Sequence, residues 1–96
     1  MIAAIVRFPH PKGTTLDDAK AIFEKTAPNY KGVQGLVRKY YLFGEEHFGG
    51  VYLWESRRAA DRQYSAAWKT MIAEKFGSPP EITYYETPVI VDNASG

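Results

Sequence analysis

The sequence predicts an α+β fold in which a four-stranded antiparallel sheet carries two helices on one face. Three observations predict it. Stretches with the spacing of strands and of helices follow one another in the order β-α-β-β-α-β. The two middle strands are separated only by a short polar turn, which makes them a hairpin. Right-handed crossovers then arrange these elements as the ferredoxin-like βαββαβ plait.

The first strand and the first helix occupy the N-terminal third of the chain. Residues 2–8 are rich in β-branched side chains and end at a Pro-His-Pro-Lys-Gly turn, which is typical of a strand that runs into a loop. Thr15, followed by Asp18, forms a short-acid version of the capping box, so a helix is expected to begin there. Pro28 removes a backbone donor and disfavours a helical residue before it. The helix should therefore end or bend near Ala27.

The hairpin over residues 35–55 is apolar on both of its faces. Successive side chains of a strand point to opposite faces, yet both alternating sets contain large apolar or aromatic residues. Pairing of Phe43 with Phe48 across the turn would decide which residues share a face. With that pairing, one face carries Lys39, Tyr41, Gly50, Tyr52 and Trp54. A slip of one residue in the loop reverses the assignment, so the sequence leaves the choice open.

The C-terminal half predicts one helix and one strand. Ser56 is a suitable N-cap, and apolar residues recur at intervals of three and four positions as far as Ile72. Gly77, with two prolines just beyond it, is a typical helix stop. The last strand is expected over residues 82–91, where Pro88 restricts part of it to a sheet edge or a bulge.

Composition and charge exclude several classes of protein. The 96 residues suit a single domain over residues 1–96. Twelve basic and eleven acidic side chains give a net charge of +1, without the basic stripe of a nucleic-acid-binding protein. The chain has no cysteine, and hence no disulfide framework or thiolate chemistry. We expect a cytoplasmic protein with no membrane partner, because no apolar stretch resembles a membrane span or a signal peptide.

The second face of the sheet predicts a homodimer. Two helices cover only one face of a sheet that is about 19 Å wide. The other face would expose an apolar patch that is large for a monomer. A second copy that lays the same face against it would cover both patches by two-fold symmetry. We therefore expect the protein to be its own partner, sheet against sheet.

Few residues show a recognisable catalytic pattern. His10 and His47 have no third ligand at a typical metal spacing, so no metal site is predicted. His47 stands at the mouth of the aromatic hairpin and could take a proton near neutral pH, although an exposed loop imidazole is the simpler interpretation. Gly49 and Gly50 lack the context of a phosphate-binding loop. They indicate instead a bulge or a close approach of backbone or ligand.

Aromatic residues make up 15% of the chain, more than a core of this size usually needs. Packing in the core and in the dimer explains many of them. Buried Tyr and Trp need partners for their polar ends, so the remainder predict a pocket with an apolar body and a few polar groups. Arg38 and Lys39 lie among them, and we expect their charged ends to reach the rim. The alternative is that they face an anionic or phenolate ligand.

Five motifs spread over nearly the whole chain form a set. They are Thr26-Ala27-Pro28-x-Tyr30-x-Gly32, Gly35-Leu36-x-Arg38-Lys39-Tyr40-Tyr41-Leu42, Gly49-Gly50-x-Tyr52-Leu53-Trp54, Phe76-Gly77-x-Pro79-Pro80 and Pro88-Val89-x-Val91-Asp92. Together they resemble the YdhR-like monooxygenases of the dimeric α/β-barrel superfamily. The resemblance implies a homodimeric α/β barrel of ferredoxin-like protomers, each with a cavity between helices and sheet. It also implies oxygenation of an electron-rich substrate by molecular oxygen, without metal, haem or flavin.

The expected function is therefore that of a cofactor-independent monooxygenase for a small electron-rich aromatic or polyketide-like substrate. His47 is the candidate base, and Tyr52 is the other candidate catalytic residue. The candidate substrate-binding residues are Arg38, Tyr40 and Trp54 on the hairpin and Phe23, Tyr64 and Trp68 on the helix side. Two alternatives stay open: a sensor or carrier that binds a small ligand without turnover, and a cofactor-free isomerase or cyclase.

Overall fold

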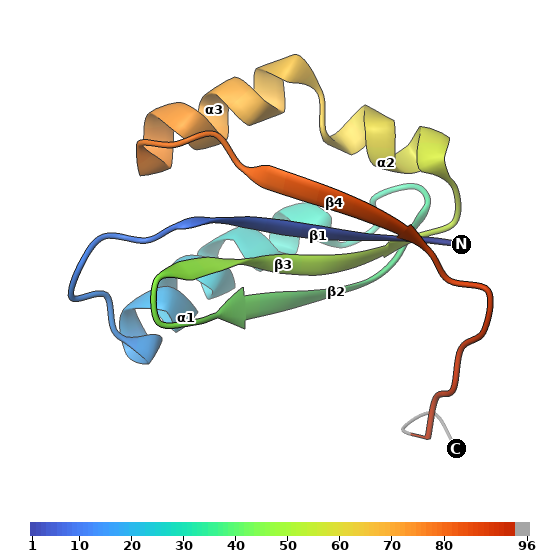
Figure 1. Cartoon of the computed structure of the whole chain (residues 1–96), viewed down its shortest axis with the longest axis horizontal. Coiled ribbons are helices and arrows are strands. Elements are labelled where there is room, and N and C mark those ends of the chain that lie inside the picture. Colours follow the sequence, from blue (N-terminus) through green and yellow to red (C-terminus); the bar gives the residue numbers. More distant parts are fainter. Residues whose placement is uncertain (94–96) are drawn as a thin grey trace.

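The structure is a computed structural model that describes residues 1–93. Its sheet has four antiparallel strands in the order β2-β3-β1-β4 (Figure 1). The elements are β1 (Ile2–Pro9), α1 (Leu16–Thr26), the 3-10 turn η1 (Ala27–Tyr30), β2 (Leu36–Phe43), β3 (His47–Trp54), α2 (Arg57–Gln63), α3 (Ala66–Phe76) and β4 (Glu81–Glu86). This order confirms the predicted ferredoxin-like class. The expected domain continues to residue 96, and residues 94–96 lie outside the described part.

The first helix begins and ends where the sequence predicts. The Thr15 hydroxyl accepts a hydrogen bond from the Asp18 amide at 3.1 Å, and the Asp18 carboxylate accepts one from the Thr15 amide at 3.0 Å. The Thr15 amide, and after it the Thr15 hydroxyl, stabilise the carboxylate and hold the pKa of Asp18 below its ordinary value. At the other end, Pro28 lies in the first turn of η1, where its missing amide is tolerated. This turn carries Tyr30 to the edge of the helix-covered side of the sheet.

The expected single second helix is wrong, because the chain breaks it into α2 and α3. Tyr64 leaves the helical region with φ −91° and ψ 50°, and the next residue, Ser65, starts a new helix by accepting a hydrogen bond from the Trp68 amide at 3.1 Å. The competing N-cap outweighs the continuous apolar spacing across this segment. Figure 1 shows the two short helices following one another. None of the helices within residues 1–93 has the length and hydropathy needed to cross a membrane.

The hairpin adopts the pairing of Phe43 with Phe48. The same register sets Lys39 opposite Tyr52 and Tyr41 opposite Gly50, and this face is the one that the helices cover. Trp54, at the end of β3, is fully buried there. Val37 is an extra residue in β2, a β-bulge that shifts the register between Leu36 and Arg38.

The last strand is shorter than expected. It stops at Glu86 rather than continuing to residue 91, because Pro88 has no amide to contribute to a ladder. The Thr87 amide still donates to the Met1 carbonyl at 3.1 Å. The C-terminal tail beyond it, residues 88–93, turns away from β4 (Figure 1). Asp92 pairs with Arg38 of β2 at 3.5 Å, whereas Val89 and Val91 are more than 80% exposed.

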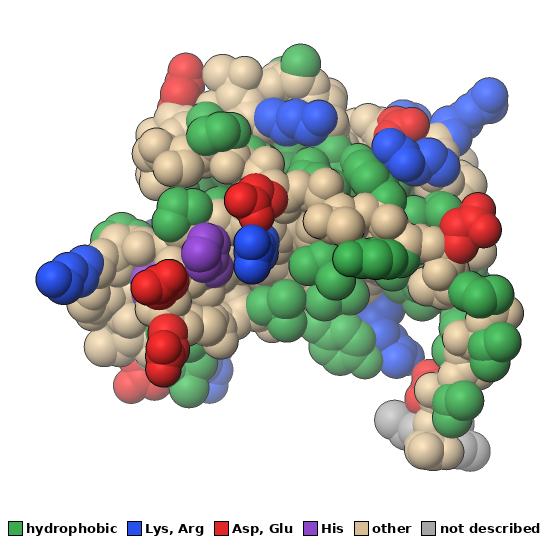
Figure 2. Space-filling model, in the orientation of Figure 1, with side chains coloured by type: hydrophobic (Ala, Val, Ile, Leu, Met, Phe, Trp, Pro, Cys, Tyr) green, Lys and Arg blue, Asp and Glu red, His purple; other side chains and the backbone are tan. Residues whose placement is uncertain are grey.

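The face of the sheet that points away from the helices is apolar and uncovered in the single chain. Tyr40, Leu42 and Tyr85 project from it and are 57%, 38% and 54% exposed. Ile5 and Val51 pair on the central strands of the same face and are half-buried. Figure 2 shows hydrophobic side chains gathered in the lower middle of the view and along the C-terminal tail. We refer to the face that points away from the helices, with Ile5, Tyr40, Leu42, Val51 and Tyr85, as the outer sheet face.

Candidate functional site

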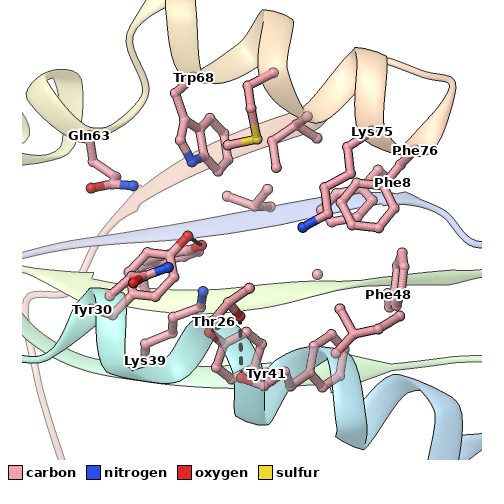
Figure 3. A pocket seen from close by; sticks show the side chains of 18 residues that line it. Phe8, Thr26, Tyr30, Lys39, Tyr41, Phe48, Gln63, Trp68, Lys75 and Phe76 are labelled. Atoms are coloured by element: carbon pink, nitrogen blue, oxygen red, sulfur yellow. Dashed lines mark hydrogen bonds between the residues drawn. The ribbon is translucent and has the colours of Figure 1, made fainter.

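A cavity of about 350 Å³ lies between the helices and the covered face of the sheet. The strands supply its floor, with Lys39 and Tyr41 from β2 and Phe48 and Tyr52 from β3. Figure 3 shows Trp68 reaching into it from α3. The helices thus stand off the sheet here, and aromatic side chains surround the space between them.

The cavity has an end lined mainly by apolar rings, which we call the apolar end although the Lys75 amine also points into it, and a polar end (Figure 3). At the apolar end, the Phe8 ring contacts those of Phe48 and Phe76, with centroid distances of 4.9 and 4.7 Å. At the polar end lie the phenols of Tyr30 and Tyr52, whose oxygens are 3.5 Å apart. Such a cavity suits a ligand that is hydrophobic over most of its length and carries polar groups at one end.

Lys39 occupies the polar end, inside a cage of three phenol rings. Its Nζ lies 3.4 Å from the ring centroid of Tyr30, 3.9 Å from that of Tyr41 and 4.5 Å from that of Tyr52. A cation within about 6 Å of an aromatic face is attracted by the quadrupole of the ring. The expectation that Lys39 reaches the rim is therefore wrong, because these rings hold its ammonium group within the cavity.

Gly50 makes room for the lysine. A Cβ atom at position 50 would lie 3.1 Å from Cε of Lys39 and 3.1 Å from the carbonyl oxygen of Tyr40. The side chain of Lys39 therefore runs from β2 over Gly50 of β3, where no side chain obstructs it. The neighbouring Gly49 is required for a different reason, because a Cβ atom there would collide with the backbone carbonyl of Val6. The close approaches predicted for this glycine pair are present at both positions.

Burial shifts the acid–base properties of this end of the cavity. Burial lowers the pKa of Lys39 to about 7, because the charged form loses hydration. Burial, with a smaller contribution from Tyr30, raises the pKa of the Tyr52 phenol. Tyr52 therefore stays protonated at neutral pH and can donate a hydrogen bond. It cannot act as a proton acceptor there.

Replacing Lys39 by Met is expected to stabilise the fold below neutral pH. The amine has a pKa near 10.5 in the unfolded chain and about 7 in the folded one, so the unfolded state binds more protons between these values. Its cost to stability is complete below pH 7 and fades as the pH rises towards 10. Lys39→Met should raise the free energy of unfolding by about 1–2 kcal/mol at low pH, a figure reduced for partial exposure.

Urea denaturation at about pH 6 and about pH 10 measures this difference. Lys69→Met, at an exposed position of α3, is the matched control and should change little at either pH. An equal effect of Lys39→Met at both pH values would show that the lysine is not desolvated.

Trp54 and Tyr64 support the cavity floor from beside it, next to Tyr52, rather than forming part of the cavity wall. The indole N–H of Trp54 donates to the Tyr64 hydroxyl at 3.1 Å, and the two residues are 0% and 4% exposed. Tyr52 stacks on Trp54 with a centroid distance of 5.9 Å. Of the expected substrate-binding residues, these two lie behind the floor and do not line the cavity.

The other expected site residues divide between the two faces of the sheet. Phe23, Tyr52 and Trp68 line the cavity. Arg38 and Tyr40 lie on the outer sheet face, where an Arg38 Nη1 donates to the Tyr40 hydroxyl at 3.2 Å. The strand alternation that brings Lys39 inward necessarily turns both of its neighbours outward.

His47 does not line the cavity. It begins β3 opposite Pro9 on β1. The other histidine, His10, donates from Nε2 to the Gly44 carbonyl at 2.8 Å and stacks on Phe43. That bond to Gly44 is the largest cause of the raised pKa of His10. His10 thus stabilises the β2–β3 turn, and neither imidazole lines the aromatic cavity.

Sequence reasoning gave Lys39 a ligand-facing position only as the alternative to the rim, and it missed Tyr30 and Tyr41 as site residues. The register of the hairpin is the signal that could have found Lys39 and Tyr41, since both share a face with Tyr52 once Phe43 pairs with Phe48. Tyr30 depends on the path of η1, which residue spacing does not predict. Within residues 1–93, no three His, Asp or Glu side chains lie close enough to hold a metal ion.

Known proteins resemble this chain in fold but not in sequence family. No protein-family model matches this chain, and no curated protein sequence matches it either. Solved structures do match over nearly the whole chain. One is the protein NE2512 of Nitrosomonas europaea, of unknown function, with a TM-score of 0.72 and 23% identity over 97% of this chain and 94% of that one.

Two oxygenases of Streptomyces share the same architecture. SnoaB of Streptomyces nogalater, a cofactor-independent oxygenase, matches with a TM-score of 0.64 and 14% identity over 94% of this chain and 95% of its own. The ActVA-Orf6 monooxygenase of Streptomyces coelicolor, solved with the ligand nanaomycin D, gives 0.67 and 17% over 97% and 92%. At these identities the likeness establishes the shared fold. It leaves the expected YdhR-like grouping within the superfamily untested.

Proposed function

We propose that this protein is a cofactor-independent monooxygenase of the YdhR-like group, acting on a small electron-rich aromatic compound. The observation that carries the proposal is the helix–sheet cavity, aromatic at one end and furnished with phenols and a caged amine at the other. Its volume of about 350 Å³ falls in the range of about 300–1,000 Å³ that small-ligand pockets occupy. The shared fold of SnoaB and ActVA-Orf6, both oxygenases, supports the same reading.

The reaction draws all its electrons from the substrate. An anthrone or a related phenol loses a proton, and the resulting anion passes an electron to molecular oxygen. The two radicals combine into a peroxide, which expels water and leaves a carbonyl group where the substrate carried two hydrogens. One oxygen atom enters the product and the other leaves as water, so no external reductant is consumed. An aromatic pocket between helices and sheet shields the reactive intermediates from side reactions.

Oxygen consumption in the presence of anthrones and dihydroxynaphthalenes tests this proposal. The wild-type chain is expected to form a quinone that has gained one oxygen atom, labelled when heavy-isotope oxygen gas is supplied. Ile22→Trp places a large ring in the cavity and should reduce turnover by about tenfold or more, equivalent to about 1.4 kcal/mol of transition-state binding. Ala21→Trp, on the exposed face of the same helix, is the matched control and should retain activity.

The two alternative functions correspond to other outcomes of this experiment. A sensor or carrier would bind these compounds without oxygen uptake. An isomerase or cyclase would convert a substrate without adding any mass. Either result, with a folded wild-type chain, would contradict the oxygenase proposal.

We propose further that two copies assemble through the outer sheet face. Strands of about eight residues in a sheet of four give a face of about 500 Å², or about 1,000 Å² buried between two copies, which reaches the lower bound for a specific interface. The exposed apolar tail, with Val89 and Val91, adds to this area. Two-fold symmetry lets Ile5 and Val51 of each copy meet the same residues of the other.

A further inference from the structure

Among residues 1–93, Lys39 is the only nitrogen base at the polar end of the cavity. The titratable residues that line the cavity are Tyr30, Lys39, Tyr41, Tyr52 and Lys75. Lys75 is exposed on α3 and lies beside Phe76, at the apolar end. No carboxylate and no histidine lines the cavity within the part of the chain that the structure describes. A proton released at the polar end can therefore pass directly only to Lys39.

The described residues surround Lys39 with aromatic rings and provide no counter-charge for it. Three phenol rings lie against the ammonium group at 3.4 to 4.5 Å. Among residues 1–93, no carboxylate forms an ion pair with it. Ring faces offset the loss of hydration only in part, and a buried charge is stabilised most by a hydrogen-bonded counter-charge. The missing counter-charge would have to come from the ligand, through the open cavity.

We propose that Lys39 is the catalytic base of this cavity and that the substrate presents an acidic phenol or enol hydroxyl to it. The substrate O–H bond breaks and an N–H bond forms at Nζ, which leaves a phenolate or enolate beside an ammonium ion. This ion pair stabilises the anion that reacts with oxygen. The ammonium group then returns its proton to the outer peroxide oxygen, which regenerates the amine. The remaining C–H proton leaves as the O–O bond breaks, so a carbonyl group forms and the outer oxygen departs as water.

This inference rests on the proposed function for its second half, the reaction of the anion with oxygen. Its first half, ionisation of a bound hydroxyl, needs no oxygen and can be measured alone. An amine with a pKa of about 7 is partly free to accept a proton at neutral pH, which is the range in which a general base works best. The groups that face it are the phenols of Tyr30, Tyr41 and Tyr52, and burial raises the pKa of Tyr41 and of Tyr52.

Binding of para-nitrophenol tests the ionisation step, because its phenolate is yellow and its neutral form is not. At about pH 6, where the probe is mainly neutral in water, the wild-type chain is expected to bind it as the yellow phenolate. Lys39→Met should bind it about tenfold or more weakly, and in the colourless form, because a charge-assisted hydrogen bond is lost. His47→Gln alters an imidazole outside the cavity and should behave as the wild type.

Lys39→Arg separates the charge of the lysine from its basicity. Arginine stays protonated, so this variant should bind the yellow phenolate yet fail to turn over anthrones, whereas wild-type turnover should rise as the pH passes through about 7. A colourless probe on the wild-type chain, equal colour on Lys39→Met, or no binding at all would overturn the inference. Ionisation that depends on Lys39, without oxygen uptake, would refute the oxygenase proposal and leave the base in place.

Discussion

Trp54→Ala is expected to destabilise the fold by about 3–5 kcal/mol, the usual cost of emptying a fully buried aromatic site. The indole is 0% exposed, and it stacks on Tyr52 and donates to the Tyr64 hydroxyl. Its removal leaves a void beside Tyr52 of the cavity floor and leaves the Tyr64 hydroxyl without its donor. Since small domains are stable by only about 5–15 kcal/mol, the variant should unfold at much lower urea concentration.

Tyr64→Phe isolates the hydrogen bond from the packing. It keeps the ring and deletes only the hydroxyl that accepts from Trp54, so it should cost about 1–3 kcal/mol for the buried donor left unpaired. Both variants are compared with the wild type at one protein concentration, because assembly would itself add stability. A loss of less than about 1 kcal/mol in Trp54→Ala would contradict the role of this pair as the support of the floor.

Val51→Glu is expected to convert a dimer into a monomer. Val51 lies on the outer sheet face, on central strand β3, with Ile5 and Tyr40 beside it. In the proposed dimer, two carboxylates would be buried near the symmetry axis without partners, which is strongly unfavourable. Sedimentation equilibrium should give twice the mass of 10.8 kDa for the wild type and the single mass for the variant.

Thr70→Glu, at an exposed position of α3, adds the same charge away from the outer sheet face and should leave the dimer intact. A wild-type chain that sediments as a stable single copy at micromolar concentration would refute the proposed assembly. The cavity would be unaffected by that result, since every residue that lines it here comes from one chain.

The fold was predictable because its strongest determinants are local. Thr15 with Asp18 encodes a helix start in four residues, and Pro28 encodes its end. The break at Tyr64 and Ser65 was not predictable from spacing, because the apolar period continues through it. There, one serine hydroxyl competes with the next turn of helix, and packing of Tyr64 against Trp54 favours the break.

The site was predictable only as far as the register of the hairpin. Arg38 and Lys39 are adjacent cations, and the residue pattern predicts the same position at the rim for both. The pairing of Phe43 with Phe48 sends Lys39 inward to the cage and Arg38 outward. Tertiary contacts on the covered face, which lie far apart in the sequence, then determine the acidity of the amine.

The side chain of Lys39 lies over Gly50, so the residue sizes at these two positions, on different strands, depend on each other. A side chain at position 50 and a long stem at position 39 would compete for one volume, so the two residues cannot be chosen independently. Among homologous chains, a bulkier residue at position 50 should therefore coincide with a shorter one at position 39. Such covariation would reveal the steric contact between these two positions without any measurement of activity.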